Sequence, residues 1–236
     1  MFFTKKKIAV VTGGTRGIGR AIALKLKECD FHVFITGTQA GVSSEFEYQA
    51  VDLSVPKSVT EFCEFLRDLK PDVLVNNAGI NVINNFSDIS LADFSLIQQV
   101  NITAAFQLCQ AVLPGMREKR GGRIINIASI WSKISKTGRA AYTASKFALD
   151  GLTTSLAAEV AADNILVNCV SPGFIDTDLT RSTLGEAGMK IIAEQIPAKR
   201  LAKPEEIAAL VAWLAGPENT YISGQNIIID GGFTRV

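Results

Sequence analysis

The sequence has little histidine, few cysteines and no excess of charge of one sign. His32 is the only histidine among the 236 residues, and the four cysteines, Cys29, Cys63, Cys109 and Cys169, are far apart with no CxxC pair. This spacing argues against zinc and dithiol redox motifs and is typical of reduced core cysteines, so we expect no metal site and interpret His32 as structural. The 24 Lys and Arg residues balance 23 Asp and Glu residues, which disfavours nucleic acid and anionic membranes as partners.

Long apolar runs are also missing. No stretch reaches the roughly 18 apolar residues that a membrane-spanning helix needs. The start, Met1–Lys7, has the cationic character of a signal-peptide n-region, but the apolar run that follows it, Ile8–Val11, is too short for a signal peptide. We therefore expect a cytoplasmic protein, and the length and composition predict one domain over residues 1–236.

Strand-length apolar runs alternate along the chain with longer segments of helical periodicity. The runs are nearly continuous in Val, Ile and Leu, which is typical of parallel strands covered on both faces. The predicted strands are Lys7–Thr12, His32–Thr36, Glu47–Val51, Asp72–Asn76, Arg123–Ala128, Leu166–Ser171 and Asn226–Ile229. The predicted helices are Gly17–Cys29, Pro56–Leu69, Leu91–Arg117, Ala140–Ala162 and Pro204–Ala215. This alternation predicts an α/β fold, a Rossmann-type doubly wound parallel sheet of about seven strands with helices on both faces.

Two segments depart from this alternation. Thr38–Phe46 leaves only about ten residues between two strands, too few for a full crossover helix, so a loop or a single turn is predicted there. Gly173–Lys203 is polar and roughly 30 residues long, and connections of that length are usually functional lids or disordered. Because it also carries apolar residues such as Leu179 and Ile191, we interpret it as a cover over the substrate site.

The first predicted strand runs directly into a glycine-rich turn, Thr12–Gly19, which a predicted helix follows. Glycine in such a turn permits positive φ and lets backbone N–H groups and the helix N-terminus approach a pyrophosphate. A purely structural glycine turn is the alternative. The strand before the turn and the helix after it favour dinucleotide binding.

The end of the second predicted strand, Thr36–Gln39, bears on the choice of dinucleotide. An acidic residue there would bind the ribose 2′-hydroxyl of NAD, but the segment contains none. Arg16 in the glycine-rich turn can instead pair with a 2′-phosphate. A solvated loop cation is the alternative for Arg16. The sequence therefore favours NADP(H) over NAD(H).

Polar residues of catalytic type occur in the second half of the chain. Tyr142 and Lys146 are spaced i, i+4 on a predicted helix, so both side chains share one face, where a nearby ammonium would favour the phenolate. Ser129 ends the fifth strand, and Asn101 lies in an otherwise apolar helix, where it needs hydrogen-bond partners. A helix-surface pair, a turn serine and an amide that holds backbone are the alternatives, and Trp131 could line a substrate pocket or pack in its loop. The joint occurrence points to proton exchange with a substrate oxygen.

These motifs, together with Asn76–Gly79 and Pro172-Gly173, resemble the short-chain dehydrogenase/reductase family in order and spacing, over almost the whole chain. Within that family the chain is most similar to the 3-oxoacyl-acyl-carrier-protein reductases of fatty-acid synthesis, through Arg16–Ala23, Val170–Asp178 and the ending Asp230–Gly232. The resemblance implies an NADP-dependent oxidoreductase that reduces a ketone to an alcohol, with a 3-oxoacyl thioester as the substrate.

The resemblance also implies residue roles. Tyr142 would protonate the carbonyl oxygen as the nicotinamide delivers hydride, and Ser129 would hydrogen-bond the same oxygen. Lys146 would lower the pKa of Tyr142 and hold the nicotinamide ribose, while Asn101 would anchor a water chain that returns the proton. Asp52 would flank the adenine, although it could instead be a helix N-terminal carboxylate. The expected cofactor-binding residues are Gly13, Gly14, Thr15, Arg16, Gly17, Ile18, Gly19, Thr38, Asp52, Leu53, Asn77, Ala78, Gly79, Tyr142, Lys146, Pro172, Gly173, Ile175 and Thr177.

The substrate and the partners stay open at this point. Arg120 matches one place where such reductases present a basic residue to the acidic acyl carrier protein near the active-site mouth, but the other place is Asp163, which would repel it. The alternatives are the same chemistry on another carbonyl, such as a sugar, a polyketide or a small ketone, and a non-catalytic NADP-binding sensor. The resemblance further implies a homotetramer formed through the helices predicted over Leu91–Arg117 and Ala140–Ala162 and through the last strand.

Overall fold

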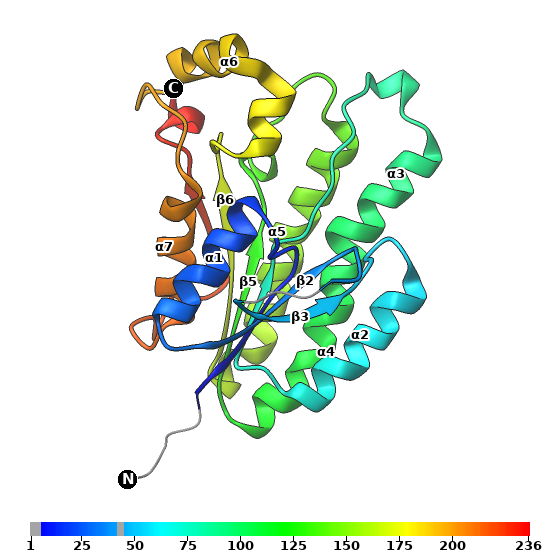
Figure 1. Cartoon of the computed structure of the whole chain (residues 1–236), viewed down its shortest axis with the longest axis vertical. Helices are drawn as coiled ribbons and strands as arrows, with labels where there is room; N and C mark the ends of the chain where they lie inside the picture. The colour runs from blue at the N-terminus through cyan, green and yellow to red at the C-terminus, as the bar shows by residue number, and fades with distance from the viewer. Residues whose placement is uncertain (1–5, 42–44) are drawn as a thin grey trace.

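All seven predicted strands form in the computed structural model, which describes residues 6–41 and 45–236. They make one all-parallel sheet in the order β3-β2-β1-β4-β5-β6-β7, which confirms the Rossmann-type prediction (Figure 1). Most of Met1–Lys7, and residues 42–44 of the short connection before β3, lie outside the described residues. The strands are β1 Ile8–Val11, β2 His32–Gly37, β3 Glu47–Ala50, β4 Val73–Asn76, β5 Gly122–Ile127, β6 Ile165–Pro172 and β7 Asn226–Ile229.

Helices cover both faces of the sheet (Figure 1). They are α1 Gly17–Glu28, α2 Pro56–Leu69, α3 Leu91–Gln98, α4 Ala104–Glu118, α5 Ala140–Val160, α6 Asp178–Gln195 and α7 Pro204–Ala215, with short 3-10 turns at Phe86–Asp88, Ile130–Ser132, Ala161–Asp163 and Phe233–Arg235. α1 and α7 pack on one face, and α2, α4 and the end of α5 pack on the other. In the part of the chain that the structure describes, no helix combines the length and apolar character that a membrane crossing requires.

Strand β1 shows why the central strands appear as continuous apolar runs. Ala9 and Val11 belong to the core on one face of the sheet, whereas Val10 belongs to the core on the other face. A strand with helices on both sides therefore has no face for polar side chains. The edge strand β3 departs from this prediction, because Glu47 and Gln49 are exposed there.

The apolar helix predicted over Leu91–Arg117 is interrupted. It consists of α3, a π-helical turn at Gln99–Thr103 and α4. A π-helical turn widens the hydrogen-bond ladder locally, and such turns are frequent at functional sites. Asn101 lies in the middle of this turn and is only 2% exposed. The irregularity therefore coincides with the residue that the sequence marks as out of place in an apolar helix.

The segment Gly173–Lys203, interpreted from sequence as a cover over the substrate site, contains α6, a helix that is absent from the predicted set. No residue of α6 is buried, and Gly185 interrupts it with φ of 63°. A helix without a buried face needs no apolar periodicity, which is why the sequence pattern did not indicate it. The other unusual connection, Thr38–Phe46, contains no helix in its described residues, as predicted.

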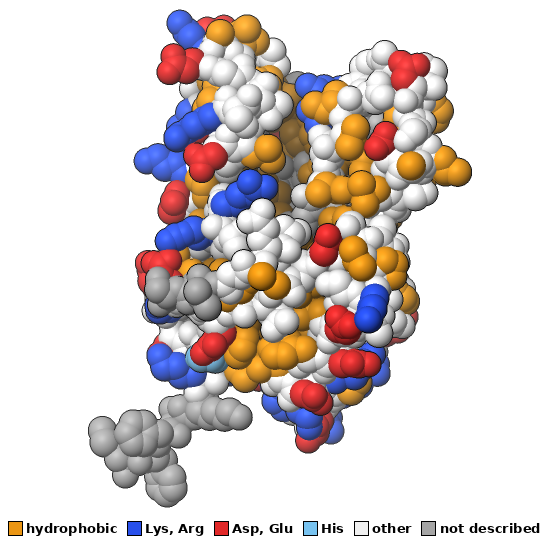
Figure 2. Space-filling view, turned by 45° about the vertical axis from the view of Figure 1, so that its right-hand side comes forward, with side chains coloured by type: hydrophobic (Ala, Val, Ile, Leu, Met, Phe, Trp, Pro, Cys, Tyr) orange, Lys and Arg blue, Asp and Glu red, His pale blue; other side chains and the backbone are white. Residues whose placement is uncertain are grey.

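A cleft opens at one end of the molecule, between the lobe that carries α6 and the lobe that carries α3 (Figure 2). Exposed hydrophobic side chains belong to both lobes, among them Phe86 and Leu91 on the α3 side and Leu179 on α6. The carboxyl ends of the central strands all point toward this cleft, so residues that follow different strands meet there.

Candidate active site

The cleft leads into a cavity of about 630 Å³ at the carboxyl ends of the central strands. Residues that follow β1, β2, β4, β5 and β6 line it, and the strand order reverses at β1, between β2 and β4. Open parallel sheets bind ligands at such a switch point, because the neighbouring connections leave toward opposite faces and open a crevice. The topology thus gathers sequence motifs that are more than one hundred residues apart.

All predicted cofactor-binding residues except Gly14 and Ile175 line the cavity. Gly14 instead lies in the turn, where its N–H donates to the carbonyl of Thr36 at 3.0 Å, and Ile175 is buried in the core. Among the predicted catalytic residues, Ser129, Tyr142 and Lys146 line the cavity, whereas Asn101 stands behind its wall. Sequence reasoning missed apolar lining residues that carry no chemical signal of their own, among them Val51, Ile80, Leu96 and Val100, whereas Leu179 belongs to the predicted cover.

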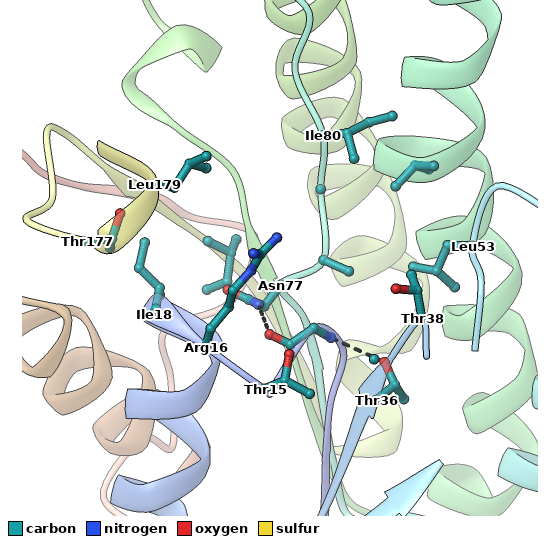
Figure 3. A pocket seen from close by; sticks show the side chains of 18 of the residues that line it. Thr15, Arg16, Ile18, Thr36, Thr38, Leu53, Asn77, Ile80, Thr177 and Leu179 are labelled. Atoms are coloured by element: carbon teal, nitrogen blue, oxygen red, sulfur yellow. Dashed lines mark hydrogen bonds between the residues drawn. The ribbon is translucent and has the colours of Figure 1, made fainter. Parts of the chain in front are cut away.

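Hydrogen bonds from two other strands hold the glycine-rich turn (Figure 3). The N–H of Gly13 donates to Thr36 Oγ1 at 3.2 Å, and Asn77 Nδ2 donates to the carbonyl oxygens of Thr12 and Gly13 at 2.9 and 3.2 Å. Gly13 has φ of 64°, and a Cβ on Gly19 would lie 2.2 Å from the Gly13 carbonyl oxygen. Only glycine fits both positions, so the turn remains tight and its backbone open to the cavity.

This wall fits a dinucleotide. The turn leads into the N-terminus of α1, whose free N–H groups and dipole suit a pyrophosphate. Arg16 is the N-cap residue of α1, lines the cavity and points into it (Figure 3). Asp52 also lines the cavity, but its carboxylate accepts hydrogen bonds from the backbone and hydroxyl of Ser54, which lower its pKa. Asp52 does not cap α2, because Val55 holds the N-cap position.

The catalytic candidates meet on the opposite wall. Tyr142 and Lys146 lie on α5, and Ser129 follows β5. Lys146 Nζ donates to the carbonyl of Ile127 at 2.8 Å and lies 5.5 Å from the centre of the Tyr142 ring. A serine hydroxyl, a phenol and an ammonium therefore line the same cavity as the glycine-rich turn, an arrangement able to hold and protonate a substrate oxygen.

Burial dominates the acid–base properties of this wall. Burial raises the pKa of Tyr142, and the Ser129 hydroxyl and the Arg139 guanidinium act against that rise. Burial lowers the pKa of Lys146 to about 8. The prediction that the neighbouring ammonium lowers the pKa of Tyr142 below its ordinary value is therefore not met by the chain alone, because desolvation outweighs the opposing groups.

Asn101 supports the site from behind. Its side chain donates to the Ile80 carbonyl at 2.9 Å and accepts from the Ile80 N–H at 2.8 Å. It also donates to Ser145 Oγ at 3.0 Å, and that hydroxyl donates to the Tyr142 carbonyl at 2.7 Å. Asn101 thus connects the segment after β4 to the first turn of α5, and it holds backbone, as one of its alternative interpretations predicts. Sequence reasoning missed Ser145.

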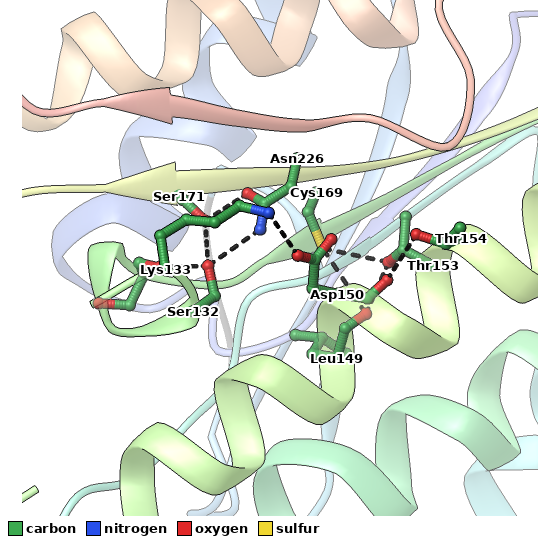
Figure 4. Close-up of polar contacts among 10 residues, drawn as sticks. Ser132, Lys133, Leu149, Asp150, Thr153, Thr154, Cys169, Ser171 and Asn226 are labelled. Carbon is green, nitrogen blue, oxygen red and sulfur yellow. Dashed lines mark hydrogen bonds and ion pairs between the residues drawn. The ribbon is translucent and has the colours of Figure 1, made fainter. Parts of the chain in front are cut away.

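A second network, also missed from sequence, fixes the backbone of Ser129. Its members Ser132, Ser171 and Asn226 are shown in Figure 4. Ser132 Oγ donates to the Ser129 carbonyl at 2.7 Å and accepts from Asn226 Nδ2 at 2.9 Å. Ser171 Oγ donates to Asn226 Oδ1 at 2.6 Å. These residues come from the ends of β5 and β6 and the start of β7, so only the sheet register brings them together.

Three further sequence interpretations are decided by position. Arg120 and Asp163 lie just before β5 and β6, at the sheet edge opposite the cavity, so within one chain they do not border the active-site mouth as expected. Asp163 is paired with Arg117 at 2.9 Å. His32 lies at the surface, 3.8 Å from Glu47. Trp131 is 7% exposed and packs edge-on against Phe174, which follows β6.

Comparisons with known proteins agree with this arrangement. The model of a family described as Enoyl-(Acyl carrier protein) reductase matches residues 13–234. A 3-oxoacyl-acyl-carrier-protein reductase of Vibrio cholerae is 40% identical over 240 residues, which cover 98% of this chain and 98% of that protein.

Solved structures of similar proteins differ in cofactor. A 4-hydroxyisoleucine dehydrogenase in complex with NADH has a TM-score of 0.91 at 32% identity, covering 98% of this chain and 100% of the other. An NADPH-dependent reductase involved in bacilysin biosynthesis has a TM-score of 0.91 at 28% identity, with the same coverage. Proteins that share this fold therefore differ in cofactor and substrate, which the residues of each individual site determine.

Proposed function

The chain belongs to the short-chain dehydrogenase/reductase family of NAD(P)-dependent oxidoreductases, and on that premise we propose that it uses NADPH to reduce the ketone of a 3-oxoacyl thioester to a secondary alcohol. The observation that carries the proposal is the placement of Ser129, Tyr142 and Lys146 in the cavity that the glycine-rich turn also lines. The 40% identity to a 3-oxoacyl-acyl-carrier-protein reductase over the whole chain supports the thioester.

Each residue has a stated task in this reaction. A bound nicotinamide supplies the hydride. Ser129 and Tyr142 donate hydrogen bonds to the ketone oxygen, where negative charge develops, and Tyr142 gives up its proton to that oxygen. A raised pKa suits Tyr142 to this direction, because the phenol is protonated at neutral pH. Lys146 holds the nicotinamide ribose, and Asn101 keeps the first turn of α5 in position through Ser145.

The preference for NADPH follows from charge in the adenosine part of the cavity. No carboxylate is present at the end of β2, in Thr36–Thr38, where the ribose 2′-hydroxyl of NAD would be bound. Arg16 lines the cavity, and its side chain makes no hydrogen bond or ion pair with any residue in 6–41 or 45–236. A 2′-phosphate would give this guanidinium a partner. NADH supporting turnover as efficiently as NADPH would contradict this preference.

The substrate is tested by following NADPH and NADH absorbance with an acetoacetyl thioester offered on coenzyme A and on acyl carrier protein. Fast oxidation of NADPH with the carrier-protein form supports the proposal. Tight NADPH binding without turnover of either thioester would contradict it, and would favour first another carbonyl substrate and then a non-catalytic sensor.

A second candidate is the same chemistry on another carbonyl compound, such as a sugar, a polyketide or a small ketone. The position of Arg120 and Asp163 at the amino ends of β5 and β6, with Asp163 paired to Arg117, favours it, because within one chain neither residue borders the cavity where a carrier protein was expected to dock. A panel of ketones with a constant NADPH concentration separates the two candidates.

A further inference from the structure

Arg139 is a cation beside the site that has no stated contact with the substrate in the proposed reaction. It is the N-cap residue of α5, three residues before Tyr142, and its carbonyl accepts a hydrogen bond from Thr143 at 2.7 Å. Residues three apart at a helix start are neighbours, with Cβ atoms about 5–6 Å apart. Lys146, about one turn beyond Tyr142, lines the cavity together with the glycine-rich turn, whereas Arg139 does not line it. Arg139 thus lies on the side of Tyr142 away from the cofactor.

The Arg139 guanidinium lacks a polar partner. Within residues 6–41 and 45–236 its side chain makes no hydrogen bond or ion pair, and its Nε atom is buried and unsatisfied. The nearby Lys133, by contrast, is paired with Asp150 at 2.7 Å. An unpartnered charge in a partly buried place is unfavourable, and burial accordingly lowers the pKa of Arg139. The Nε atom itself is buried, but the residue as a whole is only partly buried, so a ligand oxygen could reach the terminal nitrogens of the guanidinium.

Packing holds Arg139 close to the reacting groups. Its guanidinium carbon lies 6.0 Å from the centre of the Trp131 ring, and Trp131 follows Ser129 by two residues. The preceding residue, Gly138, accepts a hydrogen bond from the backbone of Asn84 at 3.3 Å, which ties this turn to the facing loop. The guanidinium is therefore placed between the segment after Ser129 and the first turn of α5, next to where the ketone would lie.

We propose that Arg139 donates to the C1 oxygen of a 3-oxo substrate while Ser129 and Tyr142 hold its C3 ketone oxygen. This inference rests on the proposed ketone reduction. A 3-oxo compound carries two oxygens on carbons separated by one methylene, which suits donors on neighbouring helix positions. A guanidinium binds either a thioester carbonyl or a free carboxylate. Hydrogen bonds from a charged donor are stronger than those between neutral groups. An isolated ketone offers no second oxygen, so Arg139 would select 3-oxo compounds.

The test compares Arg139→Met with wild type on acetoacetyl-coenzyme A, free acetoacetate and 2-butanone. Methionine is an unbranched side chain that extends as far as the position of Nε, but it has neither the charge nor any donor. We expect kcat/KM for the 3-oxo compounds to fall by about 10- to 100-fold, while 2-butanone changes by less than about twofold. Arg139→Lys keeps a charged donor, so its kcat/KM for the 3-oxo compounds should lie between the values of wild type and Arg139→Met. A larger loss with acetoacetate assigns a carboxylate as the preferred group, and an equal or larger loss with the thioester assigns the acyl carbonyl.

Two controls separate this role from a structural one. NADPH binding, measured by fluorescence titration, should be the same in Arg139→Met and wild type. Lys136→Met should leave kcat/KM unchanged, although Lys136 Nζ lies 5.6 Å from the same Trp131 ring. Unchanged kcat/KM on the 3-oxo compounds, or equal losses on all three ketones, would overturn the inference alone. A wild-type protein that binds NADPH but reduces none of them would overturn the proposed function as well.

Discussion

Lys146 is an ammonium inside the protein, 3% exposed, with the Ile127 carbonyl as its one hydrogen-bond partner among the described residues. Burial lowers the pKa of Lys146 to about 8 and raises the pKa of Tyr142, so desolvation favours the neutral form of both. At neutral pH the tyrosine therefore keeps its proton, as an acid in ketone reduction must, while the lysine carries a charge that destabilises the fold. Lys146 is thus useful for the proposed reaction, but its buried charge lowers the stability of the fold.

The desolvated ammonium of Lys146 predicts a pH-dependent effect of Lys146→Met on stability. The folded pKa lies near 8 and the ordinary value is 10.5, so the unfolded chain binds more protons between these pH values. The destabilisation is complete below pH 8 and disappears as the pH rises toward 10.5. We expect Lys146→Met to be inactive yet more stable than wild type by about 2–3 kcal/mol at pH 7, with the difference shrinking above pH 8.

Urea denaturation of the cofactor-free proteins at pH 7, 9 and 10 measures this difference. Lys57→Met is the matched control, because Lys57 is a solvent-exposed lysine on α2. Its effect on the free energy of unfolding should be small and should not change with pH. A Lys146→Met protein that is less stable than wild type at every pH would show that the hydrogen bond to Ile127 outweighs the buried charge.

At the scale of helices and strands, burial decides what the sequence could predict. Central strands such as β1 have two buried faces and appear as apolar runs. Helices α2 and α7 have one buried face and start at proline, and the ends of both helices were predicted correctly. Helix α6 buries no residue and escaped prediction. The π-helical turn in Gln99–Thr103 also escaped, although the polar Asn101 in an apolar helix indicated its place.

The site residues also differ in whether a local sequence pattern could predict them. The glycine-rich turn and Ser129 were predictable because each directly follows a strand, and the carboxyl ends of parallel strands meet at one edge. The support from Ser132, Ser171 and Asn226 depends on the register of β5, β6 and β7, which local pattern does not specify. Arg120 lies away from the cavity of its own chain because it adjoins the amino end of β5, whereas the site is at the carboxyl ends of the strands.

The π-helical turn provides a test at this scale. Asn101→Ala removes three hydrogen bonds, one of them buried and two partly buried, and leaves the Ile80 N–H and carbonyl without their side-chain partner. We expect a loss of about 2–4 kcal/mol in the free energy of unfolding and a lower kcat, because the first turn of α5 loses its tie through Ser145. Urea denaturation and NADPH oxidation measure the two effects.

Asn84→Ala is the control for this substitution, because Asn84 bonds the Asp88 carbonyl at an exposed position. Its effect on stability should stay within about 1 kcal/mol. Asn101→Ala and Asn84→Ala of equal stability and activity would show that the turn does not depend on the asparagine.

At the scale of the whole molecule, large hydrophobic side chains remain exposed away from the cleft. Phe106 on α4 and Phe147 on α5 are 44% and 46% exposed, and Trp213 on α7 is 42% exposed. Exposed apolar side chains of this size are candidates for burial between protein chains, and they lie on both sides of the sheet, α7 on one and α4 and α5 on the other. We therefore propose a homotetramer that uses α4 and α5 for one interface and the α7–β7 side for another.

Light scattering coupled to size-exclusion chromatography should give the mass of four 25.3 kDa chains. Phe147→Glu places a charge in the first interface and should reduce the assembly to a smaller species. Phe86→Ser removes an exposed phenylalanine outside both helices and should leave the mass unchanged. A wild-type monomer would contradict the proposed assembly.

Tyr142→Phe tests the central claim most directly, because it removes only the hydroxyl that is proposed to give up the proton. The measurement is NADPH oxidation with an acetoacetyl thioester, together with a fluorescence titration of NADPH on the same protein. The account predicts a loss of turnover of about 100-fold or more with NADPH binding retained. A Tyr142→Phe protein that binds NADPH and keeps substantial turnover would contradict it.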